Sequence, residues 1–233
     1  MRKLSYETLK ELNYQGYLLE NAPERVLQFG EGNFLRAFAD YFIDIMNERA
    51  GFNSKVILVQ PTGRGQKVHD FMNEQDGLYT LFLRGSEEGR EVNRKRVISG
   101  VSRCLNPYSE YESYIACARN PDLRFIISNT TEAGIAYDST CRFEDRPAQS
   151  YPGKLTQFLY ERFKAYGEKR GKGFIILSCE LIDDNGKELE KCVLQYAGQW
   201  NLGEDFIAWI KKENVFCSTL VDRIATGYPA NEA

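Results

Sequence analysis

The feature that most constrains this chain is a glycine-containing turn between an apolar run and an amphipathic stretch. Residues 25–29 form the apolar run, and Gly30-Glu31-Gly32 follows it directly. From residue 34 to residue 49, apolar side chains recur at helical spacing. A strand that passes through glycines into a helix is the junction at which α/β folds hold phosphate groups on free backbone N–H groups. Gly30 would make the tight turn, and Gly32 would let the backbone approach a pyrophosphate.

Further apolar runs alternate with helical patterns along the rest of the chain. The expected strands are residues 55–60, 124–128, 173–178 and 214–217, and the expected helices are residues 108–119, 154–170, 188–200 and 204–212. Continuous β-branched runs indicate strands that are buried on both faces. The alternation therefore predicts a doubly wound α/β fold, a mostly parallel Rossmann-type sheet with helices on both faces.

Two segments stand outside this alternation. Residues 78–84 and 91–98 flank a polar, glycine-containing turn, so we expect a β-hairpin inserted over residues 78–98. Residues 1–24 are expected to hold a leading helix, with its helical pattern over residues 6–20. We expect the whole of residues 1–233 to form one nucleotide-binding domain.

Composition excludes several classes of protein. The formal net charge of −3 argues against a nucleic-acid partner, which requires a basic surface. No apolar run approaches the roughly 20 residues of a membrane-spanning helix, and residues 1–7 lack a signal peptide's apolar core. These observations favour a cytoplasmic protein without a membrane partner. The single histidine and six scattered cysteines show no metal-ligand spacing, so we expect no metal site.

The remaining cofactor candidates lie beside the glycine turn and after the second strand. Arg36, in the first helical turn, either reaches a phosphate or pairs with Asp40. The usual acidic residue at the end of the second strand is missing, and Gln60 and Thr62 are the groups left to bind a ribose. Arg64 would instead meet a 2′-phosphate, so the residues leave NAD and NADP open. The full set of candidates in these two segments is Gly30, Gly32, Asn33, Phe34, Arg36, Gln60 and Thr62.

These segments together resemble the mannitol dehydrogenase family of long-chain polyol and sugar-acid dehydrogenases. The resemblance is carried by residues 29–37 (FGEGNFLRA), 128–135 (SNTTEAGI), 151–156 (YPGKLT) and 220–224 (LVDRI). Residues 59–65, 178–182 and 219–229 resemble the sugar-acid branch. Leu181 stands where polyol members carry a catalytic asparagine, a departure that also favours sugar acids.

The resemblance implies an NAD(H)-dependent oxidoreductase that moves a hydride between the nicotinamide and a carbonyl carbon. In the sugar-acid branch the reaction is the interconversion of tagaturonate and altronate in hexuronate catabolism. It further implies that Thr130, Thr131 and Glu132 line the cofactor crevice, with Glu180 and Asp222 on the substrate side.

The family takes its catalytic lysine from a helical C-terminal domain, in a Lys-x4-Asn-x2-His pattern that this sequence lacks. We therefore expect the catalytic residues to lie outside this chain, with self-association through the face that such a domain would cover. The alternatives are fructuronate reduction or mannitol (polyol) oxidation within the same family, and a non-catalytic NAD-binding module.

Overall fold

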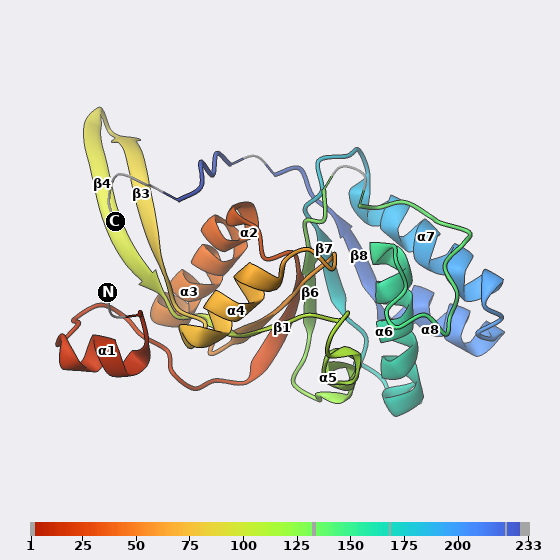
Figure 1. The fold of residues 1–233 in the computed structure, drawn as a ribbon. Helices are drawn as coiled ribbons and strands as arrows, with labels where there is room; N and C mark the ends of the chain where they lie inside the picture. The colour runs from red at the N-terminus through yellow and green to blue at the C-terminus, as the bar shows by residue number, and fades with distance from the viewer. Residues whose placement is uncertain (1–2, 132–133, 168, 222, 229–233) are drawn as a thin grey trace.

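The computed structural model describes residues 3–131, 134–167, 169–221 and 223–228. Within these residues six parallel strands form one sheet in the order β5-β2-β1-β6-β7-β8 (Figure 1). The strands are β1 (Glu24–Phe29), β2 (Lys55–Val59), β5 (Val101–Leu105), β6 (Phe125–Ser128), β7 (Ile175–Ser178) and β8 (Val215–Ser218). The order reverses between β1 and β6, as in doubly wound sheets, so the predicted Rossmann-type fold is confirmed.

Helices cover both faces of this sheet. Figure 1 shows α2, α3 and α4 on one side and α6, α7 and α8 on the other. The bounds are α1 (Tyr6–Glu11), α2 (Asn33–Ala37), α3 (Ala39–Ala50), α4 (Gln66–Glu74), α5 (Tyr111–Ala116), the 3₁₀ helix η1 (Cys117–Arg119), α6 (Tyr151–Tyr166), α7 (Asn185–Gln199) and α8 (Glu204–Glu213). The helices expected over residues 108–119, 154–170, 188–200 and 204–212 are therefore present, with shifted ends.

The two faces of the strands feed two separate apolar cores because successive side chains point to opposite sides. Leu27 and Ile57 pack with α5–α8, whereas Val26 and Val56 pack with α3 and α4. All four side chains are at most 1% exposed. Burial on both faces explains why these strands are continuous apolar runs in the sequence.

The helix expected over residues 34–49 is two helices, with a break at Phe38. In a continuous helix the Arg36 carbonyl would accept a hydrogen bond from the Asp40 N–H. Instead it accepts one from the Tyr79 hydroxyl at 2.7 Å, and Phe38 takes φ −115° and ψ −80°. A long-range contact with the hairpin thus ends α2. The local spacing of apolar residues cannot predict such a contact.

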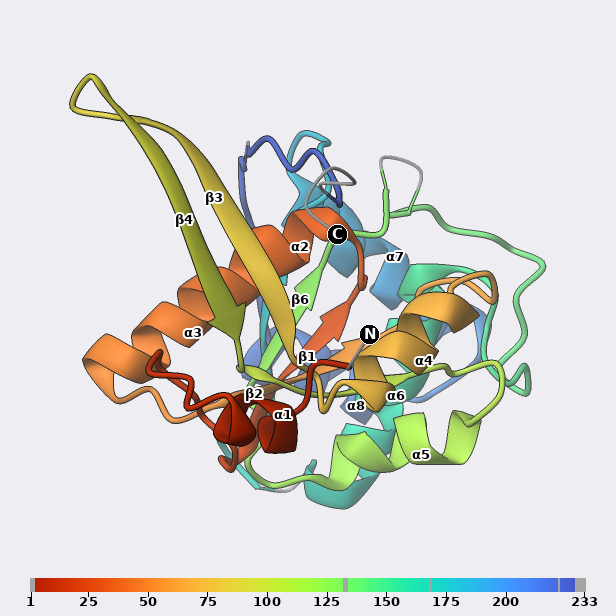
Figure 2. The ribbon, with the colours of Figure 1, turned by 60° about the vertical axis from the view of Figure 1, so that its left-hand side comes forward.

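The hairpin is present, but two other expectations need correction. β3 (Tyr79–Glu87) and β4 (Arg90–Ile98) form a separate antiparallel ribbon that projects from the body (Figure 2). The helix predicted over residues 6–20 is shorter than expected, because α1 ends at Glu11. The edge strand β5 was not predicted, since it alternates with polar residues such as Arg103. No helix in the described part of the chain is long and apolar enough to cross a membrane.

Candidate functional site

The candidate site lies at the carboxyl ends of β1, β2, β6 and β7. Phe29 is level with Val59 on one side and with Ser128 on the other, so the segments that follow these strands emerge at one edge of the sheet. This edge contains the point where the strand order reverses, which is where doubly wound sheets bind their ligands.

Gly30 begins the turn after β1 and has a backbone that only glycine adopts readily. Its φ is +119°, and a Cβ atom there would stand 2.7 Å from the Asn129 carbonyl oxygen. Its N–H donates to the Val59 carbonyl at 3.0 Å, and its own carbonyl accepts from the Gln28 side-chain amide at 3.0 Å. Gly30 is therefore a structural requirement of the turn, locked between two neighbouring strands.

Gly32 differs from Gly30 because its missing side chain leaves room. Its φ is −68°, which any residue adopts, and no described atom lies within 4 Å of the position that a Cβ would take. Gly32 and Asn33 are both exposed at the start of α2. This open, backbone-lined surface fits the approach of a pyrophosphate.

Arg36 and Phe34 complete the turn from within α2. The Arg36 guanidinium donates to Asn33 Oδ1 at 2.7 Å and lies 5.6 Å from the Phe71 ring centroid and 5.5 Å from that of Tyr79. These contacts keep the cation at the turn. The Phe34 ring stacks on the Phe38 ring, with centroids 5.5 Å apart.

Asp40, the alternative partner for Arg36, is fully buried beneath the turn. Its Oδ2 atom lies 3.5 Å from the Gln28 amide nitrogen and 3.4 Å from the Tyr79 hydroxyl. Burial raises the pKa of the Asp40 carboxyl to about 7, against the opposing effects of Gln28 and Arg36. The carboxyl therefore carries a proton in part of the neutral range.

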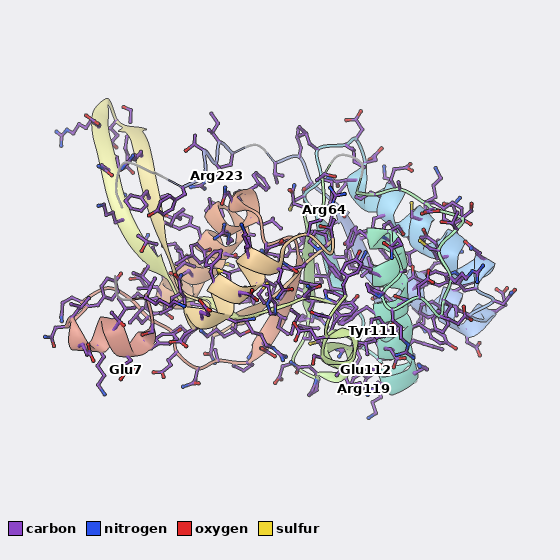
Figure 3. The ribbon with its side chains drawn as sticks, in the orientation of Figure 1. Glu7, Arg64, Tyr111, Glu112, Arg119 and Arg223 are labelled. Atoms are coloured by element: carbon purple, nitrogen blue, oxygen red, sulfur yellow. The ribbon has the colours of Figure 1, made fainter. Side chains whose placement is uncertain are left out.

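Gln60, at the end of β2, has an unsatisfied side chain. The residue is fully buried, and its amide oxygen has no hydrogen-bond donor among the described atoms. Its amide nitrogen lies beside the Glu31 carboxyl: burial raises the pKa of that carboxyl, and the Gln60 amide opposes the shift. A buried amide oxygen without a donor costs free energy, so it calls for a missing partner. Thr62 and Arg64, by contrast, are exposed in the loop that follows (Figure 3 labels Arg64). Of the two proposed ribose contacts, Gln60 is the one held in a fixed position.

The loops after β6 and β7 meet at Glu180. One carboxylate oxygen accepts the Ser128 hydroxyl at 3.0 Å, and the other accepts the Thr130 N–H and hydroxyl at 3.1 and 3.0 Å. Burial raises the pKa of Glu180, and these hydrogen bonds oppose the shift. Thr130, expected on the cofactor side, and Glu180, expected on the substrate side, are thus in direct contact.

Thr131 takes a positive φ of 95°, which is strained for a β-branched residue and typical of functional loops. Glu132 and Asp222, the two remaining candidates, lie outside the described residues. Leu181, where polyol members carry an asparagine, is 62% exposed beside the site.

The segment after β8 crosses the same edge. Asn185 accepts from the Thr219 N–H at 3.0 Å and donates to the carbonyls of Glu180 and Thr219. Further on, a Cβ at Gly227 would lie 3.3 Å from Asn33 Nδ2, and the Arg223 guanidinium lies over the Tyr41 ring. Figure 3 labels Arg223.

Sequence reasoning missed three residues of this edge. Ser128 was taken only as the end of a strand, and neither Asn185 nor Glu31 was singled out as a site residue. The available signal for Ser128 and Asn185 was a polar residue at the very end of a strand or the start of a helix that otherwise packs apolar groups. In the described part of the chain, no three histidine, cysteine or carboxylate side chains gather as metal ligands would.

Comparison with known proteins places this geometry in a family. Residues 24–232 match the profile of the mannitol dehydrogenase Rossmann domain. The altronate oxidoreductase of Escherichia coli O7:K1 is 49% identical over 225 residues, and that of Phocaeicola vulgatus is 49% identical over 224. Each alignment covers 96% of this chain and 46% of the relative, so the chain spans about half the length of these curated relatives.

Two solved structures share the fold at lower identity. Mannitol 2-dehydrogenase of Pseudomonas fluorescens, determined with NAD and D-mannitol, superposes with a TM-score of 0.76 at 23% identity. D-sorbitol dehydrogenase in substrate-free form gives 0.71 at 22% identity. The matches cover 92% and 91% of this chain, respectively, and 46% of each solved chain. The chain therefore belongs to the mannitol dehydrogenase family, whose Rossmann domain accounts for nearly all of its sequence.

Proposed function

We propose that this chain is the NAD(H)-binding part of a sugar-acid oxidoreductase, and that the whole protein interconverts tagaturonate and altronate. The observation that carries the cofactor assignment is the contrast between the two glycines. Gly30 is required by the fold, whereas nothing in the described residues requires Gly32 to lack a side chain. A ligand that approaches the backbone closely explains that second glycine. The altronate oxidoreductases at 49% identity support the choice of substrate.

The described residues divide the work of binding. The N–H groups beside Gly32 and the cation of Arg36 hold the pyrophosphate, with Asn33 and Phe34 completing the turn. Gln60 supplies an amide to the adenine ribose, and Thr62 adds a hydroxyl from the exposed loop. When bound, NAD(H) supplies or accepts the hydride, and the protein supplies position and polarity.

Glu180 acts by positioning in this proposal. Both of its oxygens already accept hydrogen bonds from Ser128 and Thr130, so the carboxylate fixes the loop after β6. That loop carries Thr130 and Thr131 toward the cofactor crevice. The roles proposed for Glu132 at the cofactor and for Asp222 at the substrate rest on the family resemblance.

Turnover by the longer protein tests the substrate. We expect NADH to be oxidised in the presence of tagaturonate, and NAD to be reduced in the presence of altronate. Fructuronate and mannitol, assayed at the same concentrations, are the matched controls. Faster turnover of either control would overturn the sugar-acid assignment and favour the corresponding alternative.

We also propose that the isolated chain self-associates through exposed apolar side chains after β8. Leu220, Ile224 and Tyr228 are 93%, 87% and 76% exposed. Phe216, by contrast, is half-buried against the apolar core beneath α6–α8. Sedimentation equilibrium should show a concentration-dependent mass that Leu220→Ser with Ile224→Ser reduces. A monomer at all concentrations would refute this.

A further inference from the structure

We infer that Glu31, inside the glycine turn, is the residue that selects NAD(H) over NADP(H), by placing a carboxylate where a 2′-phosphate on the adenine ribose would lie. The inference rests on the proposed cofactor function and adds a specificity determinant to it. It also accounts for the acidic residue that the end of β2 lacks.

Sheet register brings Glu31 to the end of β2. Phe29 pairs with Val59 in the parallel ladder, so the residues that directly follow β1 and β2 leave the sheet side by side. Glu31 is two residues beyond Phe29, at the level of the loop that contains Gln60. The carboxylate thus comes from the neighbouring strand's turn rather than from β2 itself.

The side chains of Glu31 and Gln60 converge on one place beneath Gly65. A Cβ on Gly65 would stand 2.4 Å from Glu31 Oε1 and 2.2 Å from Gln60 Nε2. Any larger residue at position 65 would therefore displace both groups. The Glu31 carboxyl therefore lies beside the loop that follows β2.

The unsatisfied amide of Gln60 points to a hydroxyl as the ligand group. Its buried oxygen has no donor, whereas its nitrogen already lies beside the Glu31 carboxyl. A ribose hydroxyl can donate to that oxygen, whereas a phosphate dianion offers acceptors only. A 2′-phosphate would leave the Gln60 oxygen unpaired and would also bring a second negative charge toward Glu31.

Two cations lie near enough to oppose this selection. Arg36 is engaged by Asn33 and by the rings of Phe71 and Tyr79, which hold it at the pyrophosphate side. Arg64 is exposed, so water weakens its attraction for a phosphate. The Glu31 carboxyl is more than half-buried, so water screens its charge less than that of Arg64, although burial also raises its pKa.

Calorimetric titration with NADH and with NADPH tests the inference on four proteins: wild type, Glu31→Gln, Arg64→Gln and Glu188→Gln. Glutamine keeps the size of Glu31 and removes its charge. Glu188 is the matched control, because it is a half-exposed carboxylate on α7 paired with Lys191, and its loss changes the net charge equally. Unfolding midpoints show that each variant is folded.

We expect wild type to prefer NADH, and Glu31→Gln to raise affinity for NADPH relative to NADH by about tenfold, the effect of removing one nearby charge. Glu188→Gln should leave the ratio unchanged, and Arg64→Gln should lower NADPH affinity at most slightly. Equal ratios in wild type and Glu31→Gln, with NADH bound by both, would overturn the inference alone. Binding of neither cofactor by wild type would overturn the proposed function and the inference together.

Discussion

The hydroxyl and the backbone N–H of Thr130 both donate to the same carboxylate oxygen of Glu180, at 3.0 and 3.1 Å. Because Ser128 donates to the other oxygen, the carboxylate joins the ends of β6 and β7 across the candidate site. Only a group with two acceptor oxygens satisfies all three donors at once.

Glu180→Gln should therefore destabilise the chain. The amide NH₂ would replace one acceptor oxygen, so the Ser128 hydroxyl would have to accept instead of donate and its own proton would lose its acceptor; the free energy of unfolding should fall by about 1–3 kcal/mol. Urea unfolding at neutral pH measures the change. Glu188→Gln, on the surface of α7, is the control and should change stability by less than about 0.5 kcal/mol. Equal values for both variants would contradict the clamp role of Glu180.

The two glycines of the turn should respond differently to alanine. Gly30→Ala forces a Cβ to 2.7 Å from the Asn129 carbonyl at a positive φ, so we expect a loss of about 1–3 kcal/mol of stability. Gly32→Ala meets open space at an ordinary φ, and its main cost is that alanine is a poorer residue than glycine at the start of a helix, so the loss should stay below about 1 kcal/mol. Thermal unfolding of both variants measures the two losses of stability. Similar losses would contradict the open space at Gly32 and the close contact at Gly30.

Gln60→Leu should weaken NADH binding without lowering the stability of the fold. Leucine has a similar volume and removes a buried amide oxygen that has no donor among the described atoms, but it also removes the contact of the amide nitrogen with Glu31, so the unfolding midpoint should not fall. The same change deprives the ribose of its hydrogen bonds, so NADH affinity should fall. A variant that is less stable, or that binds NADH as tightly as wild type, would show that the Gln60 amide has another partner.

Stability should decline with pH because of Asp40. Burial raises its pKa from the ordinary 3.8 to about 7 in the folded chain, so the folded state holds this proton more tightly than the unfolded state. The contribution is full below about pH 4 and is lost as pH rises through about 7. Asp40→Asn should remove this part of the decline, and urea unfolding at pH 5 and pH 8 compares the two proteins. Parallel declines would contradict the raised pKa.

The sequence predicted those parts of the fold that depend on local periodicity. Apolar runs such as residues 55–59 and the glycine turn at Gly30 have patterns that buried parallel strands and phosphate-binding junctions share. The break at Phe38 was not predictable, because the Tyr79 hydroxyl that takes the Arg36 carbonyl is 43 residues further along the chain.

Strand β5 was not predicted from the sequence for a different reason. Its polar residues are satisfied by tertiary contacts, as in the ion pair of Arg103 with Glu24 at 2.9 Å, and this edge strand therefore lacks a continuous apolar run. In the candidate site, Gly30, Gly32 and Gln60 were predicted, since each lies within three residues of the end of an apolar run. The convergence of Glu31 and Gln60 beneath Gly65 depends on the register of β1 against β2, which only the folded chain reveals.

The measurement that tests the central claim most directly is calorimetric titration of wild type and Gly32→Asp with NADH. Aspartate is a favourable residue at the start of a helix, and open space surrounds position 32, so this variant should fold as wild type does. We expect saturable binding by wild type and none by Gly32→Asp, because the added carboxylate fills the path of the pyrophosphate. Equal binding by the two folded proteins, or no binding by wild type, would contradict the claim.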